Sequence, residues 1–192
     1  MKSRGRVLGL MGFVCASLAL WRVAGADTYK VDPVHSFALF NVHHFNAGNV
    51  WGRFNEPAGQ FTLDQANPGK DSFQVELKVA KLDTGVAKRD SDLKGPDWFN
   101  ARQYPTLSFK STSVKKGEGN NLEVTGDLTI HGVSKSVVVN VELTGIAKDP
   151  FGNTRAGVQG TCTVKRSDFG MRTMAGAVGD EVHLIVALEG TK

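Results

Sequence analysis

Apolar and polar residues alternate along most of this chain, with the period of two that is typical of half-buried β-strands. Residues 122–130 show it most clearly, because Leu122, Val124, Gly126, Leu128 and Ile130 share one face and polar residues occupy most of the other. The same alternation recurs in residues 73–79, 137–143 and 182–188. Each of these segments is predicted to be a strand with one dry face and one wet face.

Further strands are predicted near residues 29–33, 36–45, 50–64, 105–114 and 155–166. Together the segments make about eight or nine strands, the number expected of a small barrel. Glycine-, asparagine- and proline-rich turns at 116–121 and 149–153 favour antiparallel hairpins, because parallel strands need long crossovers. The sequence therefore predicts an all-β fold, an antiparallel barrel of about eight strands.

Residues 84–103 interrupt the strand pattern. Residues 86–93 and 96–102 are expected to form short helices, and Pro96 suits the first turn of a helix, where its missing amide proton is not needed. We expect this segment to be one short helical excursion from the barrel.

The N-terminal 26 residues have the order of a secretory signal peptide. Lys2, Arg4 and Arg6 precede an apolar run at 7–21, and the small residues 24–26 precede a cleavage site after Ala26. The apolar run is shorter than the about 20 residues that span a bilayer, so no stable membrane anchor is expected. The sequence predicts an exported, periplasmic protein whose single domain covers residues 27–192.

Removing that segment changes the charge of the protein. The whole chain has 23 Lys and Arg against 19 Asp and Glu, and residues 1–26 hold four of the basic residues and no acidic one. The mature chain is then close to neutral, which gives no reason to expect nucleic acid as a partner. Cys162 is the one cysteine after residue 26, so no intramolecular disulfide is expected.

Metal and nucleophile motifs are absent from the sequence. His43 and His44 are adjacent in a predicted strand and should face opposite sides, and no Cys/His spacing resembles a zinc site. There is no Gly-x-Ser-x-Gly elbow and no phosphate-binding loop. We therefore expect no metal, no cofactor and no nucleophilic catalysis.

The interior of an eight-stranded barrel is either packed with side chains or keeps a cavity for one small ligand. The inward phase of residues 38–44 ends at His44, after Phe40 and Val42. His44 is then either a core histidine bonded to backbone or an imidazole that meets a polar ligand group at the end of an apolar face. The apolar residues Phe40, Val42, Phe54, Phe61, Phe73, Phe109 and Phe169 fit a simple core equally well.

Mixed charges crowd the helical excursion at residues 88–94. One interpretation is a solvated helix face whose neighbouring charges compensate one another. In the other, the guanidinium of Arg89 donates hydrogen bonds to an anionic or carbonyl head group at the mouth of the barrel. The sequence leaves both open.

An ordered set of motifs resembles the YceI-like family of periplasmic polyisoprenoid-binding proteins, and the resemblance covers essentially all of residues 27–192. The motifs are Asp32-Pro33-Val34-His35-Ser36, Phe40-Asn41-Val42-His43-His44, Gly52-Arg53-Phe54, Arg89-Asp90 with Leu93, Trp98-Phe99, Tyr104-Pro105 with Phe109, Gly126-Asp127-Leu128-Thr129-Ile130-His131-Gly132, and Asp168-Phe169-Gly170-Met171.

The resemblance implies a lipocalin-like barrel whose apolar tunnel holds an isoprenoid chain, either a polyprenyl lipid or the tail of a quinone. Trp98 stands where the family commonly has phenylalanine, which keeps an aromatic wall at that position. The ligand-binding residues implied in this way are His44, Arg89, Asp90, Phe40, Val42, Phe54, Phe73, Val75, Trp98, Phe99, Phe109, Leu128, Ile130 and Phe169.

Three functions follow as hypotheses. The first is a non-catalytic carrier that binds an isoprenoid lipid or quinone in the periplasm, with no nucleic acid partner. The second is an enzyme acting on the lipid head group, with His44 as acid or base and Arg89 or Asp90 assisting. The third is a filled barrel that acts as an envelope stress or interaction protein. The sequence leaves the oligomeric state open, a homodimer included.

Overall fold

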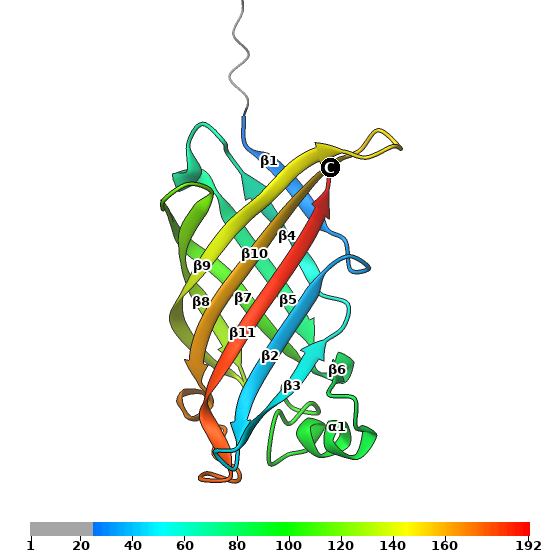
Figure 1. Cartoon of the computed structure of the whole chain (residues 1–192), viewed down its shortest axis with the longest axis vertical. Helices are drawn as coiled ribbons and strands as arrows, with labels where there is room; N and C mark the ends of the chain where they lie inside the picture. Colours follow the sequence, from blue (N-terminus) through cyan, green and yellow to red (C-terminus); the bar gives the residue numbers. More distant parts are fainter. Residues whose placement is uncertain (1–24) are drawn as a thin grey trace, which may run out of the picture.

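The computed structural model describes residues 25–192, which fold into eleven strands, one α-helix and three short 3-10 turns (Figure 1). The predicted signal peptide falls almost entirely outside the described residues and stays a prediction. The strands are β1 (Asp27–Val31), β2 (Phe37–His44), β3 (Gly48–Phe54), β4 (Ala58–Leu63), β5 (Ser72–Lys78), β6 (Leu82–Asp83), β7 (Thr106–Lys116), β8 (Asn121–Ile130), β9 (Val133–Lys148), β10 (Thr154–Lys165) and β11 (Val178–Thr191). The helix is α1 (Ala87–Lys94), and the 3-10 turns are Pro68–Lys70, Val79–Lys81 and Arg166–Phe169.

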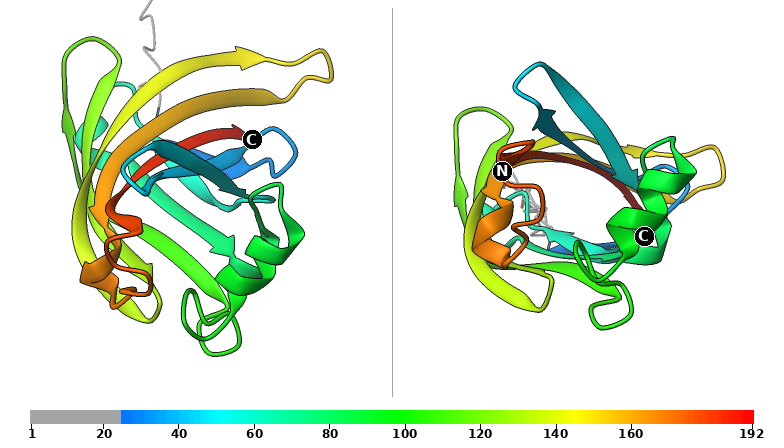
Figure 2. Two further views of the ribbon diagram at one scale, coloured as in Figure 1. Left: turned by 60° about the horizontal axis from the view of Figure 1, so that its bottom comes forward. Right: turned by 90° about the horizontal axis from the view of Figure 1, so that it is seen from below.

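Eight strands close into an antiparallel barrel. The order around the sheet is β1-β4-β5-β7-β8-β9-β10-β11, and β1 pairs with both β4 and β11 to complete the ring. Viewed from below, the strands curve around a central space, with α1 on its rim (Figure 2). The predicted fold class is therefore confirmed, and closure leaves no free edge along the ring itself.

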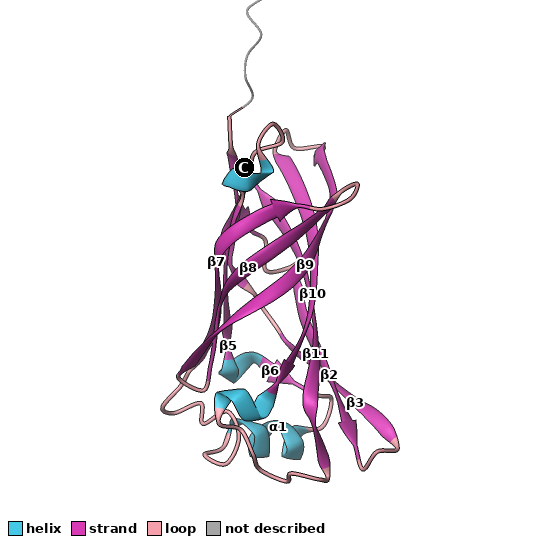
Figure 3. Cartoon of the chain, turned by 90° about the vertical axis from the view of Figure 1, so that its left-hand side faces the viewer, coloured by secondary structure: helices cyan, strands magenta, loops and turns pink. Residues whose placement is uncertain are grey.

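One edge of the long strand β11 pairs with two different strands along its length. Its C-terminal end pairs with β1 at Lys30 and Val31, and the preceding part pairs with β2 from Ala187 to Val178. The β2–β3 hairpin and β6 therefore extend the sheet from β11 at the end where α1 lies (Figures 1 and 3). This extension lengthens one wall of the barrel beyond the ring.

Alternation of burial follows the predicted inward and outward faces. In β8 the residues from Leu122 to Ile130 alternate between buried and more exposed positions through the whole strand. A bulge at Thr144 of β9, which has no partner on β10, moves the inward phase of β9 from Leu143 to Ile146, whereas β10 keeps its own phase. The period-two pattern in the sequence therefore identified the side chains that face the interior.

The buried residues form two clusters, one at each end of the barrel. The first is centred on Tyr29, Phe61 and Phe73, whose rings stack with centroid distances of 5.5 and 6.2 Å. The second surrounds Phe54 and Phe169, nearer α1. Several large residues between these clusters are only partly buried, so the barrel is not packed evenly along its axis.

One predicted strand is two in the structure. Residues 50–64 divide into the end of β3 and β4, separated at 55–57. Glu56 adopts a left-handed φ of 58°, and the Asn55 amide donates to the carbonyl of Lys81. The chain turns here from the extended β2–β3 sheet into the ring. The prediction of one uninterrupted strand was wrong, since the buried positions are even-numbered in β3 and odd-numbered in β4.

The second predicted helix, residues 96–102, is a series of hydrogen-bonded turns. Asn100 has a left-handed φ of 48°, and its amide donates to Gly95, while the Phe99 amide reaches back to Leu93. A left-handed residue cannot continue an α-helix, so the prediction failed at this point. The excursion at 84–103 consists of α1 followed by a compact loop.

Within residues 25–192, the structure has no helix with the length and apolar character needed to cross a membrane.

Candidate ligand-binding cavity

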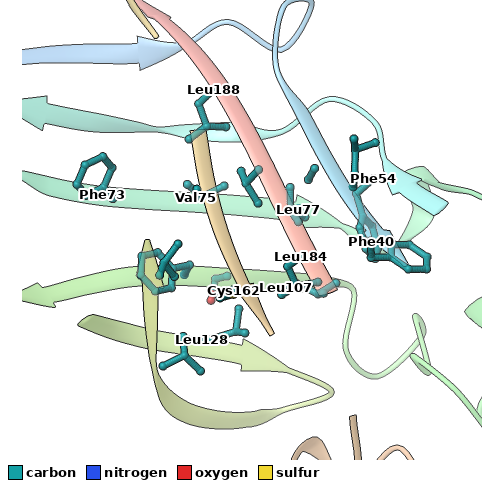
Figure 4. A pocket seen from close by; sticks show the side chains of 18 of the residues that line it. Phe40, Phe54, Phe73, Val75, Leu77, Leu107, Leu128, Cys162, Leu184 and Leu188 are labelled. Carbon is teal, nitrogen blue, oxygen red and sulfur yellow. The ribbon is translucent and has the colours of Figure 1, made fainter. Parts of the chain in front are cut away.

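An apolar cavity occupies the middle of the barrel (Figure 4). Its volume is about 120 Å³, and its wall comes from six of the ring strands, β5 and β7 to β11, together with β2 and β3. Apart from Ser108 and the thiol of Cys162, its lining side chains are hydrocarbon. The lining residues are Ala38, Leu39, Phe40, Phe54, Phe73, Val75, Leu77, Leu107, Ser108, Phe109, Leu128, Ile130, Val137, Val139, Val141, Val158, Gly160, Cys162, Leu184, Val186 and Leu188.

Aromatic packing fills the barrel beyond this cavity, at the end remote from α1. Phe73 lines the cavity, and Phe61 and Tyr29 stack behind it with 0 % and 1 % of their surface exposed. A Cβ on Gly190 would come within 2.8 Å of the Phe61 ring and of the Tyr29 Cβ, so β11 approaches this stack closely. We call this cavity, which Phe73 lines next to the aromatic stack, the inner cavity.

A second cavity, of about 260 Å³, lies next to the first at the α1 end, and we call it the outer cavity. Its wall is apolar except for five side chains, namely His44, Thr84, Arg89, Asp92 and Arg166. The remaining lining residues are Phe40, Val42, Val50, Phe54, Leu93, Trp98, Phe99, Leu107, Ile130, Val164, Phe169, Met171, Met174, Val178, Val182 and Leu184.

The two cavities share part of their wall. Both are lined by Phe40, Phe54, Leu107, Ile130 and Leu184. Together they form a lumen that is hydrocarbon at its inner end and carries charged groups at its outer end. This polarity along the axis matches an amphiphile with one long apolar part.

His44 lies at the end of β2 and lines the outer cavity, as the alternation of that strand requires. Its ring meets the exposed ring of Phe45 edge-on at 4.2 Å. Among the described residues its side chain has no hydrogen-bond partner, whereas the adjacent His43 faces the other way and bonds the carbonyl of Gly48. The structure therefore shows a half-buried imidazole on the cavity wall and not a core histidine bonded to backbone.

Arg89 and Asp90 both bind Thr84, the residue that leads into α1. Arg89 donates from Nε to the Thr84 hydroxyl at 2.8 Å and from Nη2 to its carbonyl at 2.9 Å. Asp90 accepts from the Thr84 amide and hydroxyl at 2.8 and 2.6 Å. Arg89 lines the outer cavity, but Asp90 does not, so Asp90 fixes the start of α1 behind the wall.

Arg166 is a site residue that the sequence analysis missed. Only 7 % of it is exposed, and its guanidinium donates four hydrogen bonds of 2.8–2.9 Å to backbone carbonyls. The acceptors are Met171, Thr173, Val178 and Gly179, and the Trp98 ring lies 5.7 Å from the guanidinium carbon. Burial lowers the pKa of this guanidinium.

A signal for Arg166 was present in the pattern. It continues the inward phase of β10 through Val158, Gly160, Cys162 and Val164, so an arginine on a dry face was visible in the sequence. Its role in holding the loop at 171–179 was not visible, because the acceptors are backbone atoms brought near by tertiary structure.

Cys162 is half-buried on the wall of the inner cavity. Burial raises the pKa of its thiol to about 11, so the group is a neutral, weakly polar part of an apolar surface. Its place on the wall follows from the inward phase that it shares with Gly160 and Val164 in β10.

Thirteen of the fourteen residues predicted to bind the ligand line one or both cavities, and Asp90 is the exception. Contact with an isoprenoid is not tested by this placement and stays a prediction. The sequence did not identify the outer-cavity residues Thr84, Asp92, Arg166, Met171 and Met174 as part of the site.

The described residues contain one cluster with metal-ligand geometry, outside the lumen. Polar atoms of Asp32, His35 and Glu189 lie within 4.8 Å of one another. Arg155 donates from Nη1 to Asp32 at 3.1 Å and to Glu189 at 2.5 Å. Because a guanidinium already pairs with both carboxylates, the cluster is an ion-pair network that joins β1, β10 and β11.

A family model for the YceI-like domain matches residues 29–190 of the sequence. The chain belongs to the YceI-like family. The resemblance stated from the motifs is thereby confirmed. A UPF0312 protein of Photorhabdus laumondii is 39% identical over 186 residues, covering 95% of this chain and 96% of the relative. Protein YceI of Escherichia coli is 38% identical and is covered to 97% of its length.

Several solved structures have the same fold. BcnA of Burkholderia cenocepacia superposes with a TM-score of 0.76 at 28% identity, covering 83% of this chain and 98% of that one. The YCEI protein of Campylobacter jejuni gives 0.67 at 29% identity, with 78% and 89% covered. A polyisoprenoid binding domain from Saccharophagus degradans gives 0.64, with 84% and 97% covered, and at 16% identity it shares the fold alone.

Proposed function

We propose that this protein binds an isoprenoid lipid non-catalytically, with the apolar tail in the inner cavity and the head group in the outer one. The observation that carries the proposal is the lumen itself, which is hydrocarbon at one end and charged at the other. Membership of the YceI-like family and the likeness of the fold to a domain described as polyisoprenoid-binding support it. A filled barrel, the third hypothesis, does not account for this lumen.

The chemistry of the inner cavity favours a hydrocarbon occupant. Burial of apolar groups contributes about 0.8 kcal/mol per CH₂, and an isoprenoid tail has many such groups. A polar ligand would lose its hydrogen bonds to water at a cost of about 1–3 kcal/mol per group and find only Ser108 and Cys162 in return. Affinity therefore comes mainly from the length of the tail.

The outer cavity favours a head group with carbonyl or phosphate oxygens. Two guanidinium groups, Arg89 and Arg166, and the imidazole of His44 line it, against one carboxylate, Asp92. Asp92 also pairs with Lys88, at 3.1 Å. Excess positive charge and N–H donors are what a quinone carbonyl or a polyprenyl phosphate would bind.

The arrangement gives little support to an enzyme. His44, Arg89 and Asp90 would need to reach one another or a common ligand. Within residues 25–192 no hydrogen bond joins His44 to either of the other two, Arg89 is bound to Thr84, and Asp90 is outside the cavity wall. We therefore prefer carriage, and we place it in the periplasm, on the basis of the predicted cleavage after Ala26.

Native mass spectrometry of the mature chain, purified from its own periplasm, tests the proposal. Organic extraction of the same sample would identify any lipid that is released. We expect a stoichiometric isoprenoid. A mass without ligand, unchanged after incubation with solanesol and with ubiquinone, would contradict isoprenoid binding.

A matched pair of variants tests the head-group site. Arg89→Met should weaken binding of a polyprenyl phosphate more than binding of the corresponding polyprenol, because the neutral alcohol gains less from the guanidinium. Arg102→Met removes a charge at an exposed position outside the cavity wall, so it should change neither. If Arg89→Met lost the same affinity for both lipids, the head group would bind elsewhere.

A further inference from the structure

The two cavities meet where their walls are shared, and we call this boundary the neck of the lumen. Aromatic residues from β2 and β3 form one side of it. Phe40 and Phe54 line both cavities, with their ring centroids 5.8 Å apart. Phe54 in turn meets Phe99 edge-on at 5.6 Å, so it is held from the α1 side. Any tail that extends from the outer into the inner cavity passes these rings.

The ring of Phe40 lies across the neighbouring strand rather than toward the centre of the barrel. Phe40 is the direct cross-strand partner of Gly52. A Cβ built on Gly52 would be 2.3 Å from Cζ and 2.7 Å from Cε1 of that ring. The far edge of the ring therefore occupies the space that any other residue at position 52 would fill.

Gly52 has an ordinary strand conformation, so backbone strain does not explain a glycine here. A left-handed φ, which would favour glycine, is found at other positions and not at this one. What the missing side chain provides is room on the luminal face of β3 for the aromatic ring. With alanine at this position, the ring must move by about 1 Å or more to restore van der Waals contact, and the lumen is the open side.

We propose that Phe40 and Gly52 together set how far a tail penetrates the lumen, with Gly52 keeping the Phe40 ring against the wall and the neck open. This rests on the proposed isoprenoid binding and adds to it a determinant of tail length. Short tails that end in the outer cavity do not pass the ring, whereas long tails do. The pair is thus a specificity determinant for long isoprenoid chains over short ones.

The test compares geraniol, a short probe, with solanesol, a long one, for the wild-type mature chain and for Gly52→Ala. Binding is measured by native mass spectrometry, and alkylation of Cys162 reports on the inner cavity, whose wall it lines. We expect Gly52→Ala to weaken solanesol binding more than about tenfold, because the lost contacts are many methylene groups. The affinity of Gly52→Ala for geraniol should stay within about twofold of the wild-type value. Solanesol should protect Cys162 from alkylation in the wild type and not in Gly52→Ala.

Two further variants separate displacement of the ring from damage to the strand. Gly145→Ala makes the same change in β9, where a Cβ would meet nothing within 4 Å, and should behave as wild type. Phe40→Leu in combination with Gly52→Ala removes the ring edge that the new methyl group would push. We expect this double variant to recover solanesol binding and protection of Cys162.

The outcomes distinguish this inference from the function on which it rests. If the wild type binds neither probe, isoprenoid binding itself is overturned. If the wild type binds both and Gly52→Ala binds solanesol equally well, only the neck is overturned. Failure of the double variant to recover, with the fold intact by circular dichroism, would also overturn it, since the ring would then not be the cause.

Discussion

At the scale of single residues, the lumen depends on a few side chains whose surroundings differ sharply from those of their neighbours. Arg166 holds a charge in a buried position, where backbone carbonyls accept its hydrogen bonds and no carboxylate of residues 25–192 forms a salt bridge with it. Cys162 exposes a neutral thiol to an apolar cavity. The first organises the outer cavity, and the second offers a chemical probe of the inner one.

Arg166→Met should destabilise the protein. It would leave the carbonyls of Met171, Thr173, Val178 and Gly179 without their donor, and loss of a buried charged donor costs about 2–5 kcal/mol. Urea unfolding followed by circular dichroism measures the change. Lys165→Met, at the exposed neighbouring position, is the control and should change the free energy of unfolding little.

Cys162 should react slowly with iodoacetamide in the folded protein at pH 8. With a pKa of about 11, only about a thousandth of the thiol is ionised at that pH. The urea-unfolded chain should be alkylated at the ordinary rate of an exposed cysteine, and mass spectrometry measures both. Equal rates in the folded and unfolded protein would contradict the buried position.

At the scale of elements, closure of the barrel depends on the short strand β1. It has five residues, yet it joins β4 to β11 and carries Tyr29, one of the three stacked rings. The turn after β1 adds an ion-pair network in which Arg155 contacts Asp32, Asp149 and Glu189. Aromatic packing and charge pairing therefore stabilise the same closure.

Phe61→Ala should lower the free energy of unfolding by about 3–5 kcal/mol. The ring is fully buried between Tyr29 and Phe73, so its loss leaves a cavity in the stack that closes the barrel. Chemical denaturation measures the change, and the exposed Phe151→Ala serves as the matched control. A similar small effect for both would show that the stack does not stabilise closure.

Stability should fall as the pH decreases from about 4 toward 2. Asp32, bonded first to His35, and Asp149, bonded first to Asn153, each have a pKa lowered from 3.8 to about 2, and Arg155 contributes to both shifts. Carboxyl groups with lowered folded pKa values stabilise the fold above their unfolded pKa, and protonation removes that stabilisation.

The measurement is the urea midpoint of unfolding as a function of pH. Arg155→Met should flatten the decrease between pH 4 and 2 in part, because the other hydrogen bonds to Asp32 and Asp149 remain. Arg102→Met, at an exposed position, should leave the pH profile unchanged. An identical profile in wild type and Arg155→Met would mean that Arg155 does not contribute to either shift.

At the scale of the whole molecule, the barrel is packed at the end remote from α1 and incompletely filled from its middle to the α1 end. Such a lumen carries apolar surface that lacks packing partners, so a bound hydrocarbon chain should add contacts found in no other state of the protein. Binding and folding stability are therefore coupled through the same interior.

An isoprenoid bound to the folded chain alone should raise the midpoint of thermal unfolding. The free energy of unfolding should increase with the logarithm of free ligand concentration, by about 2.7 kcal/mol at a hundred times Kd, and the midpoint should rise with it. Differential scanning calorimetry of delipidated protein, with and without solanesol, measures this. A midpoint independent of ligand concentration would contradict binding in the lumen.

The sequence by itself determined the inward and outward faces of most strands, the barrel class and the family, because strand alternation and ordered motifs are local. It placed Phe40, Val42 and His44 on one wall correctly. It did not separate β3 from β4, exclude a helix at 96–102, or show the four carbonyls around Arg166. Those features depend on left-handed residues and on the path of the loop at 171–179 around Arg166, which only the tertiary structure decides. The same holds for the neck, since Phe40 and Gly52 become neighbours only when β2 pairs with β3.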